Sequence, residues 1–237
     1  MKYLDVVIEN LPVLIFQGAK ITLQITIISV AIGCLLGLIG GLSRLSRRKV
    51  LRFLATAYVD FFRGTPLLVQ IFIVYFGIPK LLMDLQSFMV DSYGMTPVAD
   101  SFALPRFLAA VIACSLNSGA YVAEIFRAGV QSIERGQMEA ARSLGMTHGQ
   151  AMRYVILPQA FKRVIPPLGN EFIAMLKDTS LLSVIGFAEL TRNGQLIIAR
   201  TYESFAIWLT VGFIYLIMTF TLSRIVDYLE RRYKTGD

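Results

Sequence analysis

The chain has 237 residues, of which 55% are hydrophobic and only 16% are charged, and its formal net charge is +7. Its mean hydropathy is +0.62. So little polar surface excludes a soluble globule and favours a lipid bilayer as the solvent. The single histidine, His148, and two cysteines within apolar stretches, Cys34 and Cys114, exclude a histidine-rich metal centre and a disulfide framework.

The clearest predicted element is a membrane span over residues 21–42. This stretch is uncharged and has about the twenty residues that a helix needs to cross the hydrocarbon core. Basic residues follow it, which is the reverse of a signal peptide, so we expect the span to stay in the mature protein. Residues 1–20 mix charged and apolar positions and are predicted to lie along the membrane surface as an amphipathic helix.

Four more spans are predicted downstream. The second covers residues 55–76 and is interrupted near its start at residues 63–66, and a mixed, acidic connection over residues 81–102 follows it. The third covers residues 104–126, the fourth covers residues 166–190 with a break at residues 177–180, and the last covers residues 205–222. The predicted fold class is therefore all-α, a single polytopic membrane domain over residues 1–237 with about five transmembrane helices.

The distribution of Lys and Arg predicts the orientation, because short loops rich in these residues stay in the cytoplasm. Residues 44–52 hold five basic residues, whereas the connection after the second span holds three aspartates beside Lys80 and Arg106. The loop over residues 127–165 and the tail at Arg231, Arg232 and Lys234 are also basic. We therefore expect the N-terminus outside and the C-terminus in the cytoplasm. This bias accounts for the net charge without a nucleic-acid surface.

Two short helices are predicted within the basic loop of residues 127–165. Gly145 ends the first, because glycine readily takes the left-handed conformation of a helix C-cap. Thr147 and Gln150 have capping-box spacing and start the second, which is expected to run until Pro158. The pair would form a compact projection that a partner can approach closely.

The full pattern of this loop resembles the docking signature of permease subunits of ATP-binding-cassette (ABC) importers. An EAA triplet alone would more simply belong to an amphipathic hairpin that packs on its own membrane domain. The complete pattern, with the glycine and the later Leu-Pro pair at the expected spacing, is much more specific. The resemblance implies that the residues coupling to the ATPase are Glu139, Ala140, Ala141, Gly145, Leu157 and Pro158.

Residues 62–70, 117–127 and 177–181 are similar to the polar amino-acid uptake permeases, which handle histidine, arginine, lysine, glutamine and glutamate. This resemblance implies a type I importer in the bacterial plasma (inner) membrane. Its partners would be two ATPase subunits, a second permease (a homodimer or a paralogue), an extracytoplasmic binding protein and the amino-acid substrate. The sequence holds no G-x-x-x-x-G-K-[ST] loop. ATP and Mg would therefore belong to the ATPase, with no cofactor and no catalysis in this chain.

Polar residues inside the predicted spans are candidates for contact with the substrate, because such groups are costly unless they face a partner or a water-filled path. The third span offers one helical face of such groups, and the break in the fourth offers a carboxylate and two hydroxyls. These candidates are Asn117, Ser118, Tyr121, Glu124, Asp178, Thr179 and Ser180. Two carboxylates would favour a cationic amino acid, although Lys177 weakens that inference.

Both charged candidates could instead have a purely structural role. Glu124 can simply pair with Arg127 one turn on, and Lys177 with Asp178 can form an ion pair that only fixes packing. A membrane enzyme is disfavoured because no histidine lies in a span. A secondary transporter or ion-coupled carrier could use the same carboxylates, but the docking signature and the lack of a visible inverted repeat argue against it.

Overall fold

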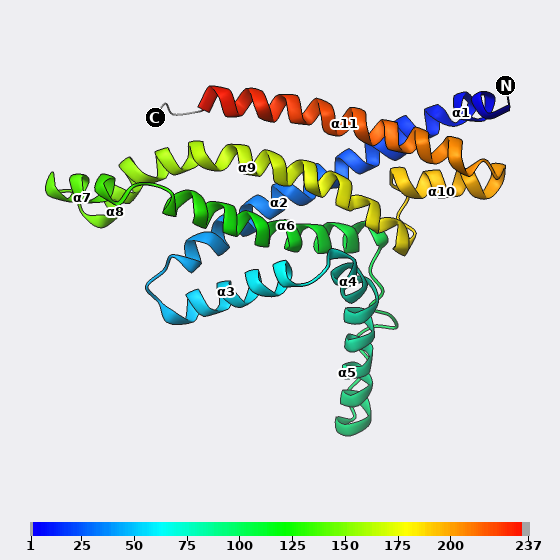
Figure 1. The fold of residues 1–237 in the computed structure, drawn as a ribbon. Helices are drawn as coiled ribbons and strands as arrows, with labels where there is room; N and C mark the ends of the chain where they lie inside the picture. The colour runs from blue at the N-terminus through cyan, green and yellow to red at the C-terminus, as the bar shows by residue number, and fades with distance from the viewer. Residues whose placement is uncertain (1, 234–237) are drawn as a thin grey trace.

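The computed structural model describes residues 2–233, and this part of the chain is helical, without a β-strand (Figure 1). The predicted all-α class is confirmed. Five long helical segments lie lengthwise in one bundle, and two small groups of elements cap its ends. The lengthwise helices are α2 (Lys20–Arg44), α3 (Lys49–Gly64), α6 (Arg106–Gln131), α9 (Leu157–Asp178) and α11 (Ser204–Tyr233).

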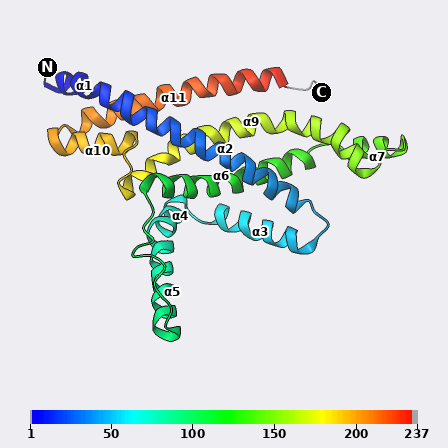
Figure 2. The same cartoon turned by 180° about the vertical axis from the view of Figure 1, so that it is seen from behind.

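The chain enters the bundle through one unbroken helix. The segment α1 (Lys2–Val13) continues through a π-helical turn, η1 (Leu14–Ala19), directly into α2. Figure 2 shows this long helix crossing in front of α6 and α9. A separate surface helix over residues 1–20 was the expectation, and the structure corrects it. Pro12 does not end the helix, because the π-helical turn that follows it accommodates the change of register.

The second predicted span is wrong in its bounds. The helix α3 ends at Gly64, and Thr65 and Pro66 are extended. The residue before a proline is disfavoured in the α region, so the helix cannot continue through this point. The chain then forms α4 (Leu67–Phe72), a π-helical turn η2 (Ile73–Gly77) and α5 (Ile78–Tyr93), and α5 projects sideways from the bundle (Figure 1).

Apolarity alone would select a different set of spans. The helices that are long and apolar enough to cross a membrane are Tyr3–Arg44, Leu67–Tyr93, Arg106–Gln131 and Ser204–Arg232. The second of these lies crosswise as the α5 arm. In contrast, α3 and α9 lie lengthwise although charged residues and two internal prolines make them less apolar. Within residues 2–233, four helices are thus long and apolar enough to cross a membrane, against about five predicted.

The fourth predicted span is broken where the sequence indicates. The helix α9 ends at Asp178, and a 3-10 segment, η4 (Thr179–Ile185), follows it. Gly186 then takes a left-handed conformation with φ of 72° and turns the chain toward α10 (Leu190–Thr201). This 3-10 segment is packed inside the protein, with Leu182 and Ile185 in the main apolar core.

The helices α2 and α6 pack almost backbone to backbone. A Cβ atom on Gly37 would lie 2.4 Å from Val122 Cγ1, and one on Gly33 would lie 2.9 Å from Ser118 Cβ. Regularly spaced small residues allow two membrane helices to approach in this way, where packing replaces the hydrophobic effect as the attractive force. This contact holds the centre of the bundle.

We expect Gly37→Ala to destabilise the protein by about 1–3 kcal/mol, because the new methyl group overlaps Val122. The matched control is Gly212→Ala in α11, where a Cβ would meet nothing within 4 Å and the better helix propensity of alanine would stabilise by about 0.5–1 kcal/mol. The midpoint of thermal unfolding of the purified protein in detergent measures both. Equal shifts for the two variants would contradict the proposed close packing.

Candidate functional site

The predicted docking loop forms a projection at one end of the bundle. Its first helix, α7 (Arg135–Ser143), ends before Gly145, which has a φ of 85°. Thr147 caps the next helix, α8 (His148–Ala151), in a capping box with Gln150. The side-chain oxygen of each residue accepts a hydrogen bond from the backbone N–H of the other. Both the glycine stop and the capping box are confirmed.

The expected end of the second helix at Pro158 is wrong. From α8 the chain continues through a π-helical turn, η3 (Met152–Ile156), into α9, whose first turn contains Pro158. Pro158 lacks the N–H that a continuous helix would use as a donor, and the wider π-helical turn η3 lies directly before it. The projection is therefore joined to α9 by continuous helix.

The exposed part of this projection carries most of the predicted coupling residues. Glu139, Ala140, Gly145 and Pro158 are exposed and Leu157 lies close to the surface, whereas Ala141 is buried against the base of the loop. A neighbouring hollow of about 300 Å³ is lined by Leu144, Gly145, Met146, Gln150 and Tyr154. Leu144 is 81% exposed, so an apolar surface is presented outward.

Glu124 lies at the centre of a cluster of arginines from three helices. Arg44 of α2 donates to it over 2.5 Å, Arg127 pairs with it along α6, and Arg63 of α3 lies 3.7 Å away. The Arg63 guanidinium also stacks 5.5 Å from the centre of the Tyr121 ring. The ion pair with Arg127, given above as the purely structural alternative for Glu124, is confirmed. Glu124 and Tyr121 thus sit among excess positive charge.

Asn117 has a partner within the chain. It is 5% exposed and donates to Gln70 Oε1 over 2.9 Å. The Gln70 amide in turn donates to the carbonyl oxygens of Phe62 and Thr65 at 2.8 and 3.0 Å. This network satisfies the backbone where α3 breaks off, so Asn117 supports the fold at that point.

Ser118 faces Glu171, a carboxylate that the sequence analysis missed. The Ser118 hydroxyl is fully buried and has no hydrogen-bond partner of good geometry among the described residues, and the Glu171 carboxyl lies beside it. Glu171 and Asp178 are seven residues apart, on one face of α9, and lie within electrostatic reach of each other. The structure therefore places Glu171 beside Ser118, and Asp178 lies two helical turns further along the same face of α9. The spacing of the two carboxylates was the signal that could have revealed Glu171.

The other predicted residues of the α9 break differ in their surroundings. Thr179 is fully buried, and its hydroxyl donates to the carbonyl oxygen of Leu176 over 2.7 Å. Ser180 is half-buried in the 3-10 segment. Among the ion pairs between residues 2–233, none joins Lys177 to Asp178.

The sequence analysis also missed Glu189, a carboxylate that holds two parts of the fold together. Glu189 is fully buried and caps α10, and its two oxygens accept from the N–H groups of Thr191 and Arg192 at 2.8 Å each. The Tyr215 hydroxyl of α11 donates to it over 3.0 Å. Glu189 therefore ties the segment after the α9 break to the last helix.

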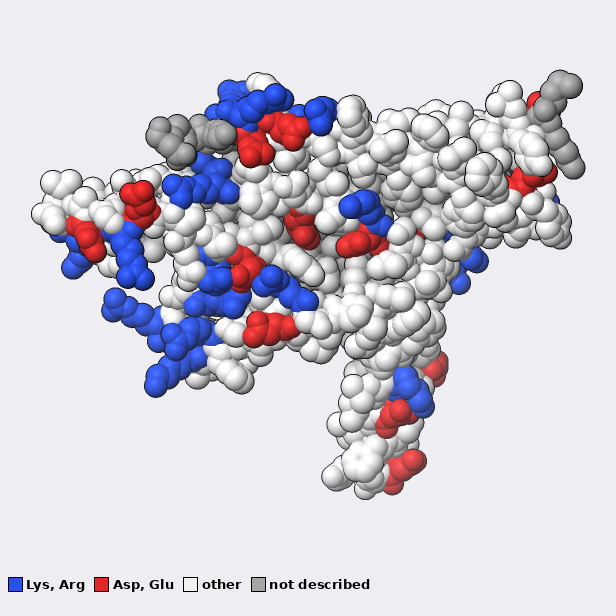
Figure 3. All heavy atoms as spheres, in the orientation of Figure 1, with Lys and Arg blue, Asp and Glu red and all other residues white. Residues whose placement is uncertain are grey.

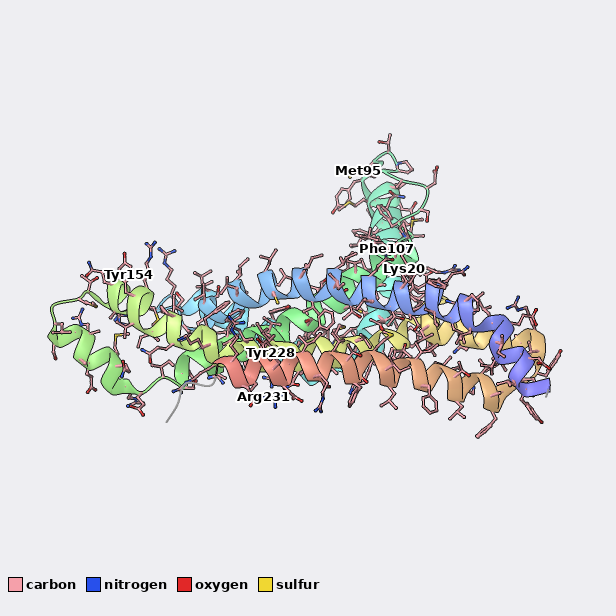
Figure 4. All side chains as sticks on the ribbon, turned by 90° about the horizontal axis from the view of Figure 1, so that it is seen from above. Lys20, Met95, Phe107, Tyr154, Tyr228 and Arg231 are labelled. Carbon is pink, nitrogen blue, oxygen red and sulfur yellow. The ribbon has the colours of Figure 1, made fainter. Side chains whose placement is uncertain are left out.

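Charge is distributed unevenly along the molecule. Figure 3 shows Lys and Arg gathered toward the end that carries α7, α8 and the start of α3, while the middle of that face is mostly uncharged. Figure 4 places Tyr154 at this basic end and Met95 at the tip of the crosswise arm. Within residues 2–233, no group of three or more His, Cys, Asp or Glu side chains could hold a metal ion.

Comparison with known proteins decides the family. Residues 29–235 match the family model described as "Binding-protein-dependent transport system inner membrane component". The chain belongs to this family. The resemblance on which the sequence analysis rests is thereby confirmed, and the protein is a permease subunit with several membrane-spanning helices.

Individual relatives cover almost the whole permease. It is 42% identical over 221 residues to the glutamine transport system permease protein GlnP of Escherichia coli (strain K12), covering 93% of each chain. It is 38% identical to the arginine transport system permease protein ArtQ of Bacillus subtilis (strain 168), covering 94% of each. The L-cystine transport system permease protein TcyB of the same organism is 42% identical, with 96% of this chain and 90% of TcyB covered.

Solved structures agree with the fold. A crystal structure of an amino acid ABC transporter with histidines matches with a TM-score of 0.82 and 44% identity, over 95% of this permease and 96% of that chain. The MetNI methionine ABC transporter in an inward-facing conformation matches with a TM-score of 0.69 at 20% identity, over 94% and 97% of the two chains, and supports the fold alone.

We expect Glu124→Gln to destabilise this permease by roughly 1–3 kcal/mol, because it leaves partly buried arginines without their carboxylate. Arg127→Gln should cost less, since Glu124 keeps Arg44. A double-mutant cycle of these two changes, followed by thermal unfolding, should show a clear coupling energy. Unchanged unfolding with reduced uptake would instead favour a direct role in substrate binding.

Proposed function

We propose that this permease forms the translocation pathway of an ABC importer for polar amino acids, together with a second copy of itself or a paralogue. Two ATPase subunits on separate chains would bind and hydrolyse ATP with Mg, and an extracytoplasmic binding protein would deliver the amino acid. The observation that carries the proposal is the docking projection. It has an exposed Glu139-Ala140 surface and a left-handed turn at Gly145, and it is joined to α9 by continuous helix.

The coupling mechanism follows from this connection. When the ATPase subunits close on ATP, they would push the paired projections together. Because η3 and α9 continue the projection without a break, a displacement there would be transmitted along α9 to Glu171 and Asp178. The pathway would then change from inward-open to outward-open, and hydrolysis would reset it.

The orientation proposed is N-terminus outside and C-terminus in the cytoplasm. Five lengthwise helices give an odd number of crossings, and the basic residues gather at the end with the docking projection (Figure 3). Figure 4 places Arg231, at the end of α11, toward the same end of the molecule, while Lys234 falls outside the described residues.

The substrate would pass the polar groups between α6 and α9. Ser118 and Glu171 face each other there, Asp178 lies two turns further along α9, and Thr179 and Ser180 follow directly in the α9 break. Two carboxylates on one face of α9 favour an amino acid with a cationic group, and one relative named for arginine transport supports a substrate of that class. Asn117, Tyr121 and Glu124 would act more indirectly, through the network at Gln70 and the arginine cluster.

The decisive experiment co-expresses the permease with candidate ATPase subunits and reconstitutes the complex in liposomes. ATP hydrolysis is then measured with a binding protein loaded with arginine, histidine, glutamine or glutamate. Stimulation by one loaded binding protein would establish the importer and its substrate. If no ATPase associates, the proposal fails and an ion-coupled carrier takes its place.

We expect Gly145→Val to reduce stimulated ATP hydrolysis about tenfold, because a β-branched residue cannot easily hold the left-handed turn between α7 and α8. The amount of permease in the membrane should not change, since a Cβ at this position meets nothing within 4 Å. The matched control is Gly145→Asn, because asparagine tolerates the left-handed conformation and should retain activity within about twofold. Full activity of the valine variant would remove the turn from the coupling mechanism.

We also expect Asp178→Asn and Glu171→Gln each to impair uptake of a cationic amino acid more than uptake of glutamine, because each removes a negative charge beside the proposed path. Asp84→Asn on the crosswise arm removes the same charge far from that path and serves as the control. Radiolabelled uptake into proteoliposomes measures all three. Equal losses for the cationic and neutral substrates would argue against a role of these carboxylates in selectivity.

A further inference from the structure

An apolar cavity of about 220 Å³ lies between α2, α6 and α9, close to the base of the docking projection. Every residue that lines it is apolar. Leu38 and Leu42 of α2 form one wall with Leu45 at the C-cap, Val130 forms part of the α6 wall, and Leu157 and Phe161 form part of the α9 wall. The transport pathway proposed above makes no use of this cavity.

The lining excludes a polar occupant. An amino acid placed here would lose the hydration of its ammonium and carboxylate groups without gaining a hydrogen bond, which is strongly unfavourable. Water would be held poorly for the same reason, because a buried water needs polar partners. The cavity is therefore suited to a hydrocarbon group.

Part of the cavity lining is exposed on the outer surface of the bundle. Leu38, Leu42 and Phe161 are 41%, 49% and 58% exposed, so the apolar lining continues onto the outer surface. The α2 wall spans the last turns of the uncharged stretch and ends beside Arg44, the last residue of that helix. This is the depth at which lipid acyl chains meet their headgroups, and an acyl chain is the hydrocarbon available there.

Basic residues follow two of the lining residues in the sequence. Arg47, Arg48 and Lys49 follow Leu45, Lys162 follows Phe161, and all four are exposed. None of them takes part in an ion pair with another residue of the described chain. Their charge complements the phosphate of an anionic lipid, and basic pockets between helix ends on the cytoplasmic side favour such headgroups.

We propose that this cavity is a binding site for an anionic phospholipid of the leaflet on the side of the docking projection. One acyl chain occupies the cavity, and the phosphate lies against Arg47 and Arg48. Val130 lies one residue before the end of α6, and Leu157 is the first residue of α9. The bound acyl chain therefore fills the space between the two helices from which the docking projection extends. The lipid therefore supports the base of the coupling element.

The test uses a phosphatidylglycerol analogue with a photoreactive diazirine on one acyl chain, in nanodiscs that contain the permease with its ATPase. After illumination, labelled peptides are mapped by mass spectrometry, and we expect labels on residues 38–45 and 157–164. Leu42→Trp should lower this labelling about tenfold, which corresponds to about two acyl methylenes that lose their burial. The matched control is Ile39→Trp, which lies on α2 at the same depth, is 64% exposed and does not line the cavity.

The headgroup is tested separately with Arg47→Gln and Arg48→Gln. Each change should lower labelling by the phosphatidylglycerol analogue about fivefold. Arg231→Gln and Arg232→Gln remove the same charge from the end of α11 and should leave labelling unchanged. Equal labelling by phosphatidylcholine and phosphatidylglycerol analogues, or by Leu42→Trp and the unaltered chain, would overturn the proposal. An absence of label on the cavity peptides would also overturn the proposal, because no acyl chain would then occupy the cavity.

Discussion

The close approach of α2 and α6 is the constraint on which the rest of the bundle depends. With no side chain at Gly33 and Gly37, the backbones of the two helices pack closely against each other. The helix α3 is attached to this pair, since the Tyr58 hydroxyl of α3 donates to the Leu116 carbonyl oxygen of α6 over 2.7 Å. The same pair brings Arg44 to Glu124, because the end of α2 arrives beside the carboxylate of α6.

The polar groups within the bundle divide into two kinds. Asn117 and Glu189 are satisfied by backbone or amide partners, and Glu124 is surrounded by arginines, so these groups hold helices to one another. Ser118 and Glu171 instead face each other without a complete set of partners in the described chain. A buried polar group with unfilled bonding capacity is costly in a protein built only for stability, and it is the kind of group that a transported solute can complete.

The sequence predicted most of the architecture, since the uncharged stretch before Arg44 and the basic loop around Gly145 are strong local signals. It failed where tertiary contacts decide. Residues 67–93 are apolar enough to cross a membrane yet lie crosswise, because the extended Thr65-Pro66 pair redirects the chain. The hydrogen bond from Asn117 to Gln70 was not predicted, because the two residues are 47 positions apart and no local pattern connects them. Glu171 escaped notice because its meaning depends on Ser118 across the helix interface.

The crosswise arm has a consequence for how such a chain can change over time. No residue of α5 is buried within the protein, and the chain returns along it held mainly by Gln86, which bonds Val98 and Ala99. A Cβ on Gly94 at the tip would meet nothing within 4 Å. Residues added or removed between Tyr93 and Pro97 therefore alter no internal packing. Evolution can lengthen, shorten or decorate this one segment while the glycine contact between α2 and α6 stays as it is.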